Sequence, residues 1–165
     1  MKTKLYLIIV LVVVALSVNA QSKDEKSFKI GAGAMIGLPT GDVANFTTMA
    51  YGVDLLGEYS VAPSFALTAS LGYLDFAAKS GMSGLKMGFV PVLVGAKYYF
   101  TEKVYGSGQI GVSFSTQSGG GNAFTFAPGI GCKVTGNFDL MLKYQSASKE
   151  GSAISFLGVR AGLTF

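Results

Sequence analysis

The residues able to do chemistry in this chain are few, and their types exclude several kinds of catalysis. The chain contains no histidine and a single cysteine, Cys132. A Ser-His-Asp triad therefore cannot form, and a zinc ion would find only one thiolate beside scattered carboxylates. Asp54 and Glu58 stand four residues apart, which places them on one face of a strand. We interpret this carboxylate pair as structural, and we expect no enzymatic activity, no cofactor and no metal ion.

The other candidate residues are charged side chains of both signs, which alternation along the predicted strands assigns to one inner face. Isolated charges in a narrow interior would be costly, so we expect them to pair across it. Our preferred pairing joins Arg160 and Lys97 to Asp54 and Glu58. Lys29 and Gln109 share this face. The predicted lumen charge network consists of Asp54, Glu58, Lys97, Lys133, Asp139, Lys143 and Arg160.

The last nine residues show most clearly which elements must position these charges. From Leu157 to Phe165 every odd position is apolar, and the even positions are Gly158, Arg160, Gly162 and Thr164. Because successive side chains of a strand point to opposite faces, this pattern gives one apolar face and one tight, polar face. Glycine suits a crowded interior better than open water. We therefore expect a polar inside and a lipid-facing outside.

The N-terminus indicates export. Lys2 and Lys4 precede an apolar run from Leu5 to Leu16, and Val18-Asn19-Ala20 supplies small residues for cleavage. This is the pattern of a secretory signal peptide, and the run is too short for a membrane-spanning helix. We predict a signal peptide at 1–20, a short segment at 21–26 and one barrel domain at 27–165. The net charge of +4 is too small to indicate a nucleic-acid partner.

Turn signals divide the remaining chain into eight segments of about the length that a tilted strand needs to cross a membrane. We place the strands at about residues 27–39, 50–60, 64–76, 87–100, 104–115, 124–135, 138–146 and 153–165. No helix fits between them. Bilayers admit only helices or closed barrels, so the predicted fold is all-β, an eight-stranded antiparallel up-and-down transmembrane β-barrel.

The predicted connections alternate between short and long, as in outer-membrane barrels, with the short turns in the periplasm. The segment 147–152 is expected to be one of the longer loops. Pro91 and Pro128 lack a backbone donor, and we expect them near the outer ends of their strands, where a bulge or fraying absorbs the loss. If inner-face glycines, Gly33 and Gly131 among them, leave space for water, they would favour a narrow channel.

Apolar residues of matching parity form the expected lipid-facing wall, and aromatic residues occupy the ends of the strands. Two aromatic girdles at the two interfaces are typical of membrane barrels. The predicted girdle residues are Tyr51, Tyr59, Phe65, Tyr73, Tyr98, Phe100, Phe114, Phe126, Phe138 and Tyr144.

Several stretches resemble the outer-membrane protein beta-barrel domain family, the OmpA/OmpX-like "porin family" group of small Gram-negative barrels. They are the segments 38–42, 69–73, 91–103 and 128–131 and the aromatic C-terminus. The resemblance implies a location in the bacterial outer membrane. It also implies that Leu163 and Phe165 form the signal read by the barrel assembly machinery, although Arg160 stands where that signal often has glycine.

Three functions stay open at this point. The first is a structural, membrane-integrity role for a barrel plugged by its own ion pairs. The second is a narrow passive channel for ions or small solutes. The third is a surface interaction or adhesion protein, although the loops are rich in serine and glycine and nearly neutral. We expect a monomer surrounded by outer-membrane lipid.

Overall fold

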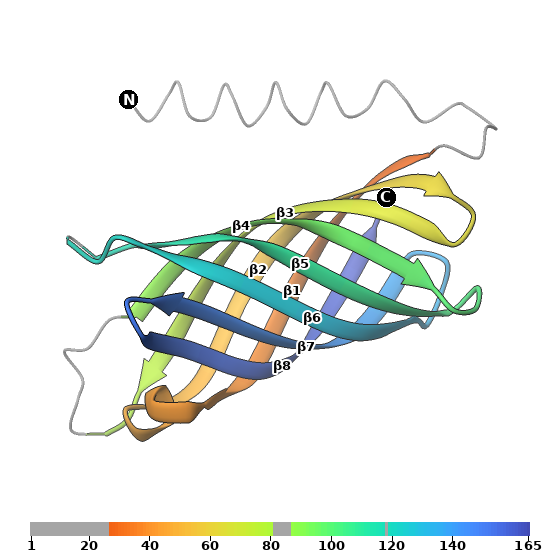
Figure 1. The fold of residues 1–165 in the computed structure, drawn as a ribbon. Helices are drawn as coiled ribbons and strands as arrows, with labels where there is room; N and C mark the ends of the chain where they lie inside the picture. Colours follow the sequence, from red (N-terminus) through yellow and green to blue (C-terminus); the bar gives the residue numbers. More distant parts are fainter. Residues whose placement is uncertain (1–26, 81–86, 118) are drawn as a thin grey trace, which may run out of the picture.

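The chain folds into one closed β-barrel (Figure 1). The computed structural model describes residues 27–80, 87–117 and 119–165. The predicted signal peptide at 1–20 and the segment 21–26 lie outside the described residues. The elements are β1 (Phe28–Thr40), the short 3-10 helix η2 (Gly41–Asn45), β2 (Thr47–Ala62), β3 (Phe65–Ala78), β4 (Met87–Tyr99), β5 (Val104–Ser115), β6 (Asn122–Lys133), β7 (Phe138–Lys149) and β8 (Ser152–Thr164).

Each strand pairs antiparallel with the next, and β8 pairs with β1 to close the sheet. In the closing ladder Ala34 lies opposite Ala161 and Met35 lies opposite Arg160. Closure leaves no sheet edge with free N–H and C=O groups, which is what a lipid environment requires. The predicted fold class is confirmed.

The two ends of the barrel differ in their connections. Residues 63–64, 100–103 and 134–137 link the strands at one end, which we call the short-turn end. The connections after β1, β3, β5 and β7 lie at the opposite end, which we call the long-loop end. In Figure 1 the short-turn end, with the C-terminus, faces right, and η2 marks the long-loop end at the lower left.

One expectation about the lengths of the connections was wrong. The stretch 147–152 is not a longer loop, because β7 and β8 continue to Lys149 and Ser152 and only Glu150 and Gly151 turn the chain. Both turn residues have positive φ, 48° and 84°, as a tight primed hairpin turn demands. The small residues of this stretch are typical of loops, yet they continue the regular ladder between β7 and β8.

The chain also contains a helix that the sequence analysis did not expect. The 3-10 turn η2 begins at Gly41, whose φ of 72° suits glycine, and it carries Val43 into the barrel mouth. Val43 is buried there against apolar side chains. Among the described residues, no helix is long and apolar enough to cross a membrane.

Pro91 and Pro128 lie within the ladders rather than at the rim of the barrel. Pro128 sits midway along β6, and Pro91 points to the buried side of β4. The β6–β7 ladder breaks between the Phe126 and Gly129 pairs and then resumes in the same register. The β3–β4 ladder breaks likewise beside Pro91. A short gap without a bulge therefore accommodates each missing donor, which corrects the expectation of rim positions.

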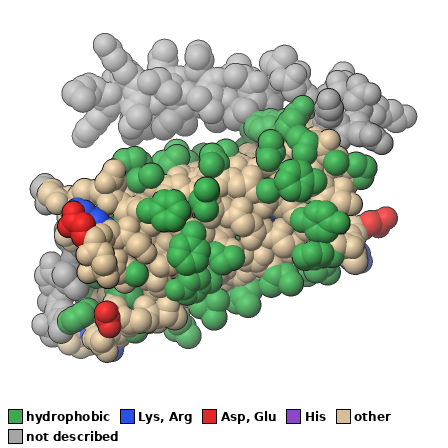
Figure 2. Space-filling model, viewed as in Figure 1, with side chains coloured by type: hydrophobic (Ala, Val, Ile, Leu, Met, Phe, Trp, Pro, Cys, Tyr) green, Lys and Arg blue, Asp and Glu red, His purple; other side chains and the backbone are tan. Residues whose placement is uncertain are grey.

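The outer wall of the barrel is apolar, as the alternation predicts. Val94 exposes 58% of its surface and Leu55 exposes 57%, whereas their chain neighbours Leu93 and Leu56 are buried. In Figure 2 hydrophobic side chains cover the middle of the visible wall and charged ones gather at the two ends. This distribution is the one that a bilayer stabilises.

The position of Val94 halfway along the wall gives a test of the membrane orientation. Val94→Arg should lower the free energy of unfolding from vesicles by about 2–4 kcal/mol, because its charge would lie near the bilayer midplane. Val104→Arg, at the first residue of β5 near the short-turn end, is the matched control and should cost at most about 1 kcal/mol. Reversible urea unfolding measures both. Equal costs at the two positions would contradict the proposed depth.

Candidate functional site

The interior of the barrel brings together charged residues that are distant in sequence. Asp54 and Glu58 come from β2, Lys97 from β4 and Asp139 from β7. Arg160 comes from β8, 106 positions after Asp54. Each occupies an inward-facing position of its strand, and closure of the sheet makes these positions neighbours across the lumen. The candidate site is therefore a product of the barrel as a whole.

Arg160 is the centre of this group. Its Nε donates to both carboxylate oxygens of Asp54, at 3.0 and 2.8 Å, and its Nη2 donates to Asp54 Oδ1 at 2.6 Å. Its Nη1 lies 3.7 Å from Asp139 Oδ1. Only 2% of Arg160 is exposed. A fork of guanidinium donors on one carboxylate is a strong, directional ion pair, and here it also reaches a second carboxylate.

Lys97 and Glu58 form the second buried pair. Lys97 Nζ lies 2.8 Å from Glu58 Oε2, and the Tyr99 hydroxyl donates to Glu58 Oε1 at 2.7 Å. The pairing that charge alone suggested, Arg160 and Lys97 with Asp54 and Glu58, is the one present in the structure. These two pairs satisfy carboxylates that would otherwise be costly to bury.

Two tyrosines link the ion pairs, and the sequence analysis missed both. Tyr105 is fully buried, its hydroxyl donates to Asp139, and Lys97 Nζ lies 4.6 Å from the centre of its ring. Tyr99 packs against Tyr105 with 5.5 Å between ring centres. The alternation of side chains could have identified both as inward-facing, because Tyr99 has the same parity as Lys97 on β4 and Tyr105 the same parity as Gln109 on β5.

The two remaining lysines of the predicted network, Lys133 and Lys143, and Lys29 of the same predicted inner face form no ion pair with the described carboxylates. Lys143 is 4% exposed, and its Nζ lies 3.4 Å from Gln109 Oε1. Within the described ranges no carboxylate forms an ion pair with Lys143. Lys133 lies over the Tyr99 ring at 4.4 Å, a cation–π contact, and Lys29 is exposed at the short-turn end. The network therefore has a paired core and unpaired lysines around it.

The inner-face glycines make room for large side chains rather than for water. A Cβ on Gly33 would come within 2.5 Å of the Arg160 guanidinium. A Cβ on Gly131 would collide with the Tyr105 ring, and one on Gly162 with Arg160 and Asp139. The space left by these glycines is already filled.

The lumen toward the long-loop end contains an apolar cluster, which the sequence analysis also missed. Phe76 packs edge-on against Phe89 and Phe156, with ring centres 6.1 and 6.0 Å apart. The hydrophobic cluster consists of Met35, Val43, Ala50, Leu74, Phe76 and Phe156, with Met87, Phe89 and Ile154 packed against it. The described part of the lumen thus has ion pairs near the short-turn end and an aromatic cluster toward the long-loop end, where the buried polar side chains of Ser113, Thr125 and Gln145 also lie.

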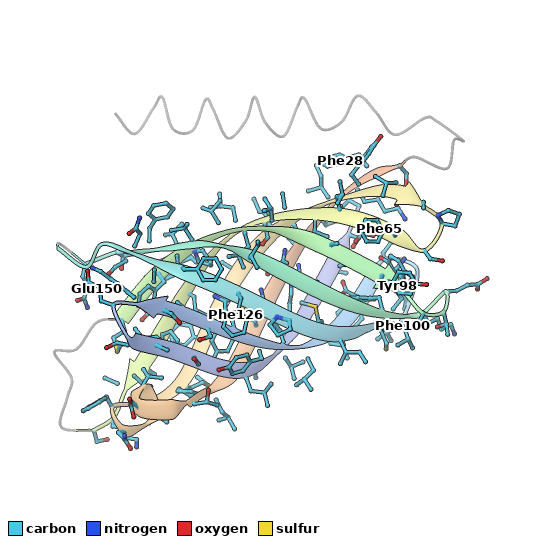
Figure 3. The ribbon with its side chains drawn as sticks, viewed as in Figure 1. Phe28, Phe65, Tyr98, Phe100, Phe126 and Glu150 are labelled. Atoms are coloured by element: carbon cyan, nitrogen blue, oxygen red, sulfur yellow. The ribbon has the colours of Figure 1, made fainter. Side chains whose placement is uncertain are left out.

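The predicted girdle residues lie on the outer wall at half-buried or exposed positions. Figure 3 shows Phe65, Tyr98 and Phe100 near the short-turn end, with Glu150 at the opposite end. Tyr98 packs on Phe100 and Phe126 packs on Tyr144, with ring centres 5.5 and 5.9 Å apart. Of the predicted assembly signal, Leu163 faces outward and Phe165 is 79% exposed.

The described residues hold no group of three or more His, Cys, Asp or Glu side chains placed to bind a metal ion. Cys132 is exposed on the outer wall.

A closed eight-stranded barrel with an apolar outer wall, aromatic ends and charges inside defines a small outer-membrane β-barrel protein. The outer membrane protein beta-barrel domain matches residues 8–165, and the chain belongs to this family. No curated protein sequence matches it.

Solved barrels share the fold at low sequence identity. Ail, the attachment invasion locus protein of Yersinia pestis, in complex with the heparin analogue sucrose octasulfate, has 15% identity and a TM-score of 0.64 over 86% of this chain and 100% of that chain. The N-terminal β-barrel domain of Pseudomonas aeruginosa OprF has 11% identity and a TM-score of 0.59, over 85% and 99%. A de novo designed transmembrane β-barrel has 16% identity and a TM-score of 0.55, over 88% and 99%.

The contacts of Arg160 predict a large loss of stability when it is removed. Arg160→Ala should lower the free energy of unfolding by about 3–5 kcal/mol, because Asp54 becomes an uncompensated buried charge. Replacing both partners, Arg160→Met with Asp54→Leu, should recover most of this loss. Lys133→Ala is the control and should cost at most about 1 kcal/mol, the worth of its cation–π contact. Urea unfolding in vesicles compares the variants, and no recovery in the double variant would contradict the pairwise account.

The contact between Gly131 and Tyr105 gives a second test. Gly131→Ala should destabilise the barrel by about 1–3 kcal/mol, because the Tyr105 ring is held on all sides and cannot move away without strain. Gly108→Ala is the matched control, since open space surrounds that position. It should change stability by less than about 0.5 kcal/mol. Thermal unfolding followed by circular dichroism suffices, and a tolerant Gly131 would show that the lumen is loosely packed.

Proposed function

We propose that this protein is a structural component of the outer membrane whose lumen is closed by its own side chains. The observation that carries the proposal is the buried network running from Asp54 through Arg160 and Asp139 to Tyr105, Lys97 and Glu58. An eight-stranded barrel has an interior just wide enough to be filled by side chains. A filled interior of paired charges leaves little room for solutes.

The apolar cluster of the lumen supports the same proposal. Phe76 and Phe156 are almost fully buried within the cluster at the long-loop end. Water and ions are excluded from such packing because neither finds polar partners there. Ionic packing and apolar packing thus fill different parts of the lumen. This arrangement favours membrane integrity over transport.

The proposal also includes how the protein is exported, how it is oriented in the membrane and what it contacts there. A signal peptide at 1–20 would direct the chain to the secretory pathway, and Leu163 and Phe165 would be read by the barrel assembly machinery. The short-turn end would face the periplasm, as in other outer-membrane barrels. The protein would act as a monomer in outer-membrane lipid, without a cofactor or catalytic activity.

A narrow passive channel is the second candidate, favoured by polar groups that continue beyond the ion pairs. Gln109 Nε2 donates to Ser70 Oγ at 3.1 Å, and Lys143 contacts Gln109. Farther along, the Thr125 hydroxyl donates to Ser113 Oγ at 2.7 Å. Charged groups inside a membrane protein are functional candidates by default. Opening the Arg160 pair would connect these groups into a path.

The surface-interaction hypothesis has weaker support. Ail was solved with a heparin analogue, a polyanion, which suggests looking for a basic surface. The described residues at the long-loop end instead carry charges of both signs, at Asp42, Lys79, Lys149 and Glu150. Such a balanced surface does not favour a polyanionic partner.

Conductance of the refolded protein in a planar bilayer distinguishes the first two candidates. The wild type should give no discrete current steps, because the lumen is filled, while heat-modifiable gel mobility shows that the protein is folded. Arg160→Ala should introduce small steps by unseating the plug. The Gly108→Ala variant, altered only on the outer wall, should stay silent. Discrete steps in the wild type that change with Arg160→Ala would contradict the structural role and establish the channel.

A further inference from the structure

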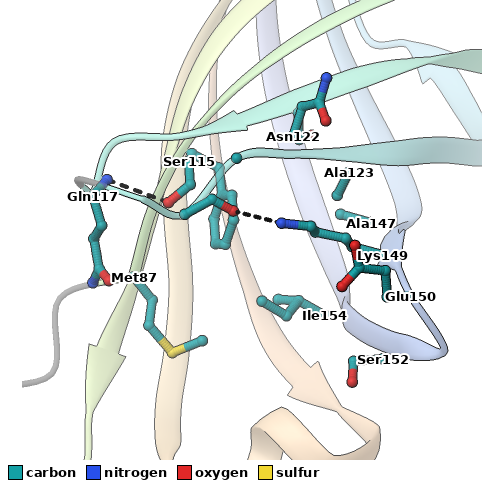
Figure 4. Close-up of a pocket in the computed structure, with 14 residues that line it drawn as sticks. Met87, Ser115, Gln117, Asn122, Ala123, Ala147, Lys149, Glu150, Ser152 and Ile154 are labelled. Carbon is teal, nitrogen blue, oxygen red and sulfur yellow. Dashed lines mark hydrogen bonds between the residues drawn. The ribbon is translucent and has the colours of Figure 1, made fainter.

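A cavity of about 450 Å³ opens at the long-loop end of the barrel, beside the hydrophobic cluster (Figure 4). Residues from five strands line it, β4 to β8, together with residues of the connections after β5 and β7. Its volume lies within the range of small-molecule sites in proteins. The ionic network does not contribute to its lining. It is therefore a feature separate from the lumen plug.

One wall of the cavity is apolar and continuous with the protein core. Met87, Phe89 and Ile154 line the cavity and pack with their other sides against the hydrophobic cluster. In Figure 4 the side chains of Met87 and Ile154 point into the same space. Apolar atoms of a ligand placed here would extend the packing of the core and leave water.

The opposite wall is polar. Ser113 and Ser115 line it, so hydroxyl groups that can donate and accept hydrogen bonds face the cavity. Lys149 reaches across the mouth, and its Nζ donates to the carbonyl oxygen of Gly120 at 3.4 Å (Figure 4). Glu150 lines the mouth beside it. The two formal charges cancel, and uncharged polar groups make up the rest of this wall.

The base of the cavity is closed toward the lumen. Ser113 is buried and accepts a hydrogen bond from the Thr125 hydroxyl at 2.7 Å, while Ala147 is also buried. Gln145, one step below Ala147 on the inner face of β7, is 3% exposed, and its Oε1 receives no hydrogen bond from the described residues. A molecule entering from the long-loop end would stop at this level. The cavity is therefore shaped for binding rather than for passage.

We propose that this cavity binds a small, uncharged amphipathic molecule of the size of a medium-chain alcohol or amide. Its apolar chain lies against Met87, Phe89 and Ile154, and its polar head exchanges hydrogen bonds with the serine side chains. An uncharged head fits because a charged one would be attracted by one of Lys149 and Glu150 and repelled by the other. The proposal does not depend on whether the lumen below conducts.

The experiment uses 1-decanol as the probe and the refolded protein in lipid nanodiscs, with 13C-labelled methionine and isoleucine methyl groups. Saturable shifts and nuclear Overhauser contacts to decanol are expected at Met87 and Ile154. Ile110 and Ile130 face the lipid and report decanol dissolved in the bilayer, so their shifts should grow without saturation. A response at Ile154 that follows that of Ile110 at every concentration would overturn the proposal.

Cavity-filling variants provide the specificity control. Ala123→Phe and, as an independent variant, Ala147→Leu both add side-chain volume inside the cavity and should abolish the saturable response. Ala34→Phe adds the same ring as the first variant on the exposed outer wall and should leave the response unchanged. Saturable binding that survives in both folded filling variants would place the site elsewhere and refute the proposal.

The head group is tested with probes of the same chain length and a permanent charge. Decyl sulfate and decyltrimethylammonium should each bind at least about tenfold more weakly than decanol, because each places one sign of charge beside a like charge. Equal or tighter binding of either probe would overturn the assignment of an uncharged ligand. Weaker binding of both, with saturable binding of decanol, supports it.

Discussion

The hydrogen-bonded ladder between β1 and β8 is the constraint on which the rest of this structure depends. Once Ala34 lies opposite Ala161, every strand has two partners and the backbone is satisfied within the sheet. Closure also separates side chains by parity, so that Met35 and Arg160 face the lumen together while their neighbours face outward. An open sheet of the same sequence would expose both the unpaired edge and the buried charges to lipid.

Within that closed wall, two kinds of packing share the interior. Near the short-turn end, Arg160 bridges Asp54 and Asp139. Tyrosine hydroxyls donate further hydrogen bonds to Asp139 and Glu58. Toward the long-loop end, aromatic side chains replace the ion pairs. The ionic part fixes a unique arrangement because each charge needs its partner, whereas the apolar part excludes water. Beside the apolar part the filling is incomplete, and a cavity open at the mouth is the result.

The family and the similar solved barrels define an outer-membrane β-barrel without assigning it a task. Barrels of this size have the same kind of strand wall and differ in the side chains that fill the lumen and in the loops that cover its ends. In this chain the distinguishing features are the Arg160 network, the cluster around Phe76 and the mouth crossed by Lys149. Function is therefore argued from those contacts, which fill the lumen and leave a small site at its long-loop end.

The sequence by itself determined the strands, the inner and outer faces and the charges that had to meet, because side chains alternate strictly along a strand and charges in a lumen require partners. The meeting of Arg160 and Lys97 with Asp54 and Glu58 could be predicted for that reason, although not which cation takes which carboxylate. Alternation does not give height along the barrel axis or neighbours across the lumen. Tyr105 beneath Lys97, the cluster around Phe76, the unbroken register past Pro128 and the tight turn at Gly151 were decided by the tertiary structure, because closure and strand stagger alone fix which inward side chains touch.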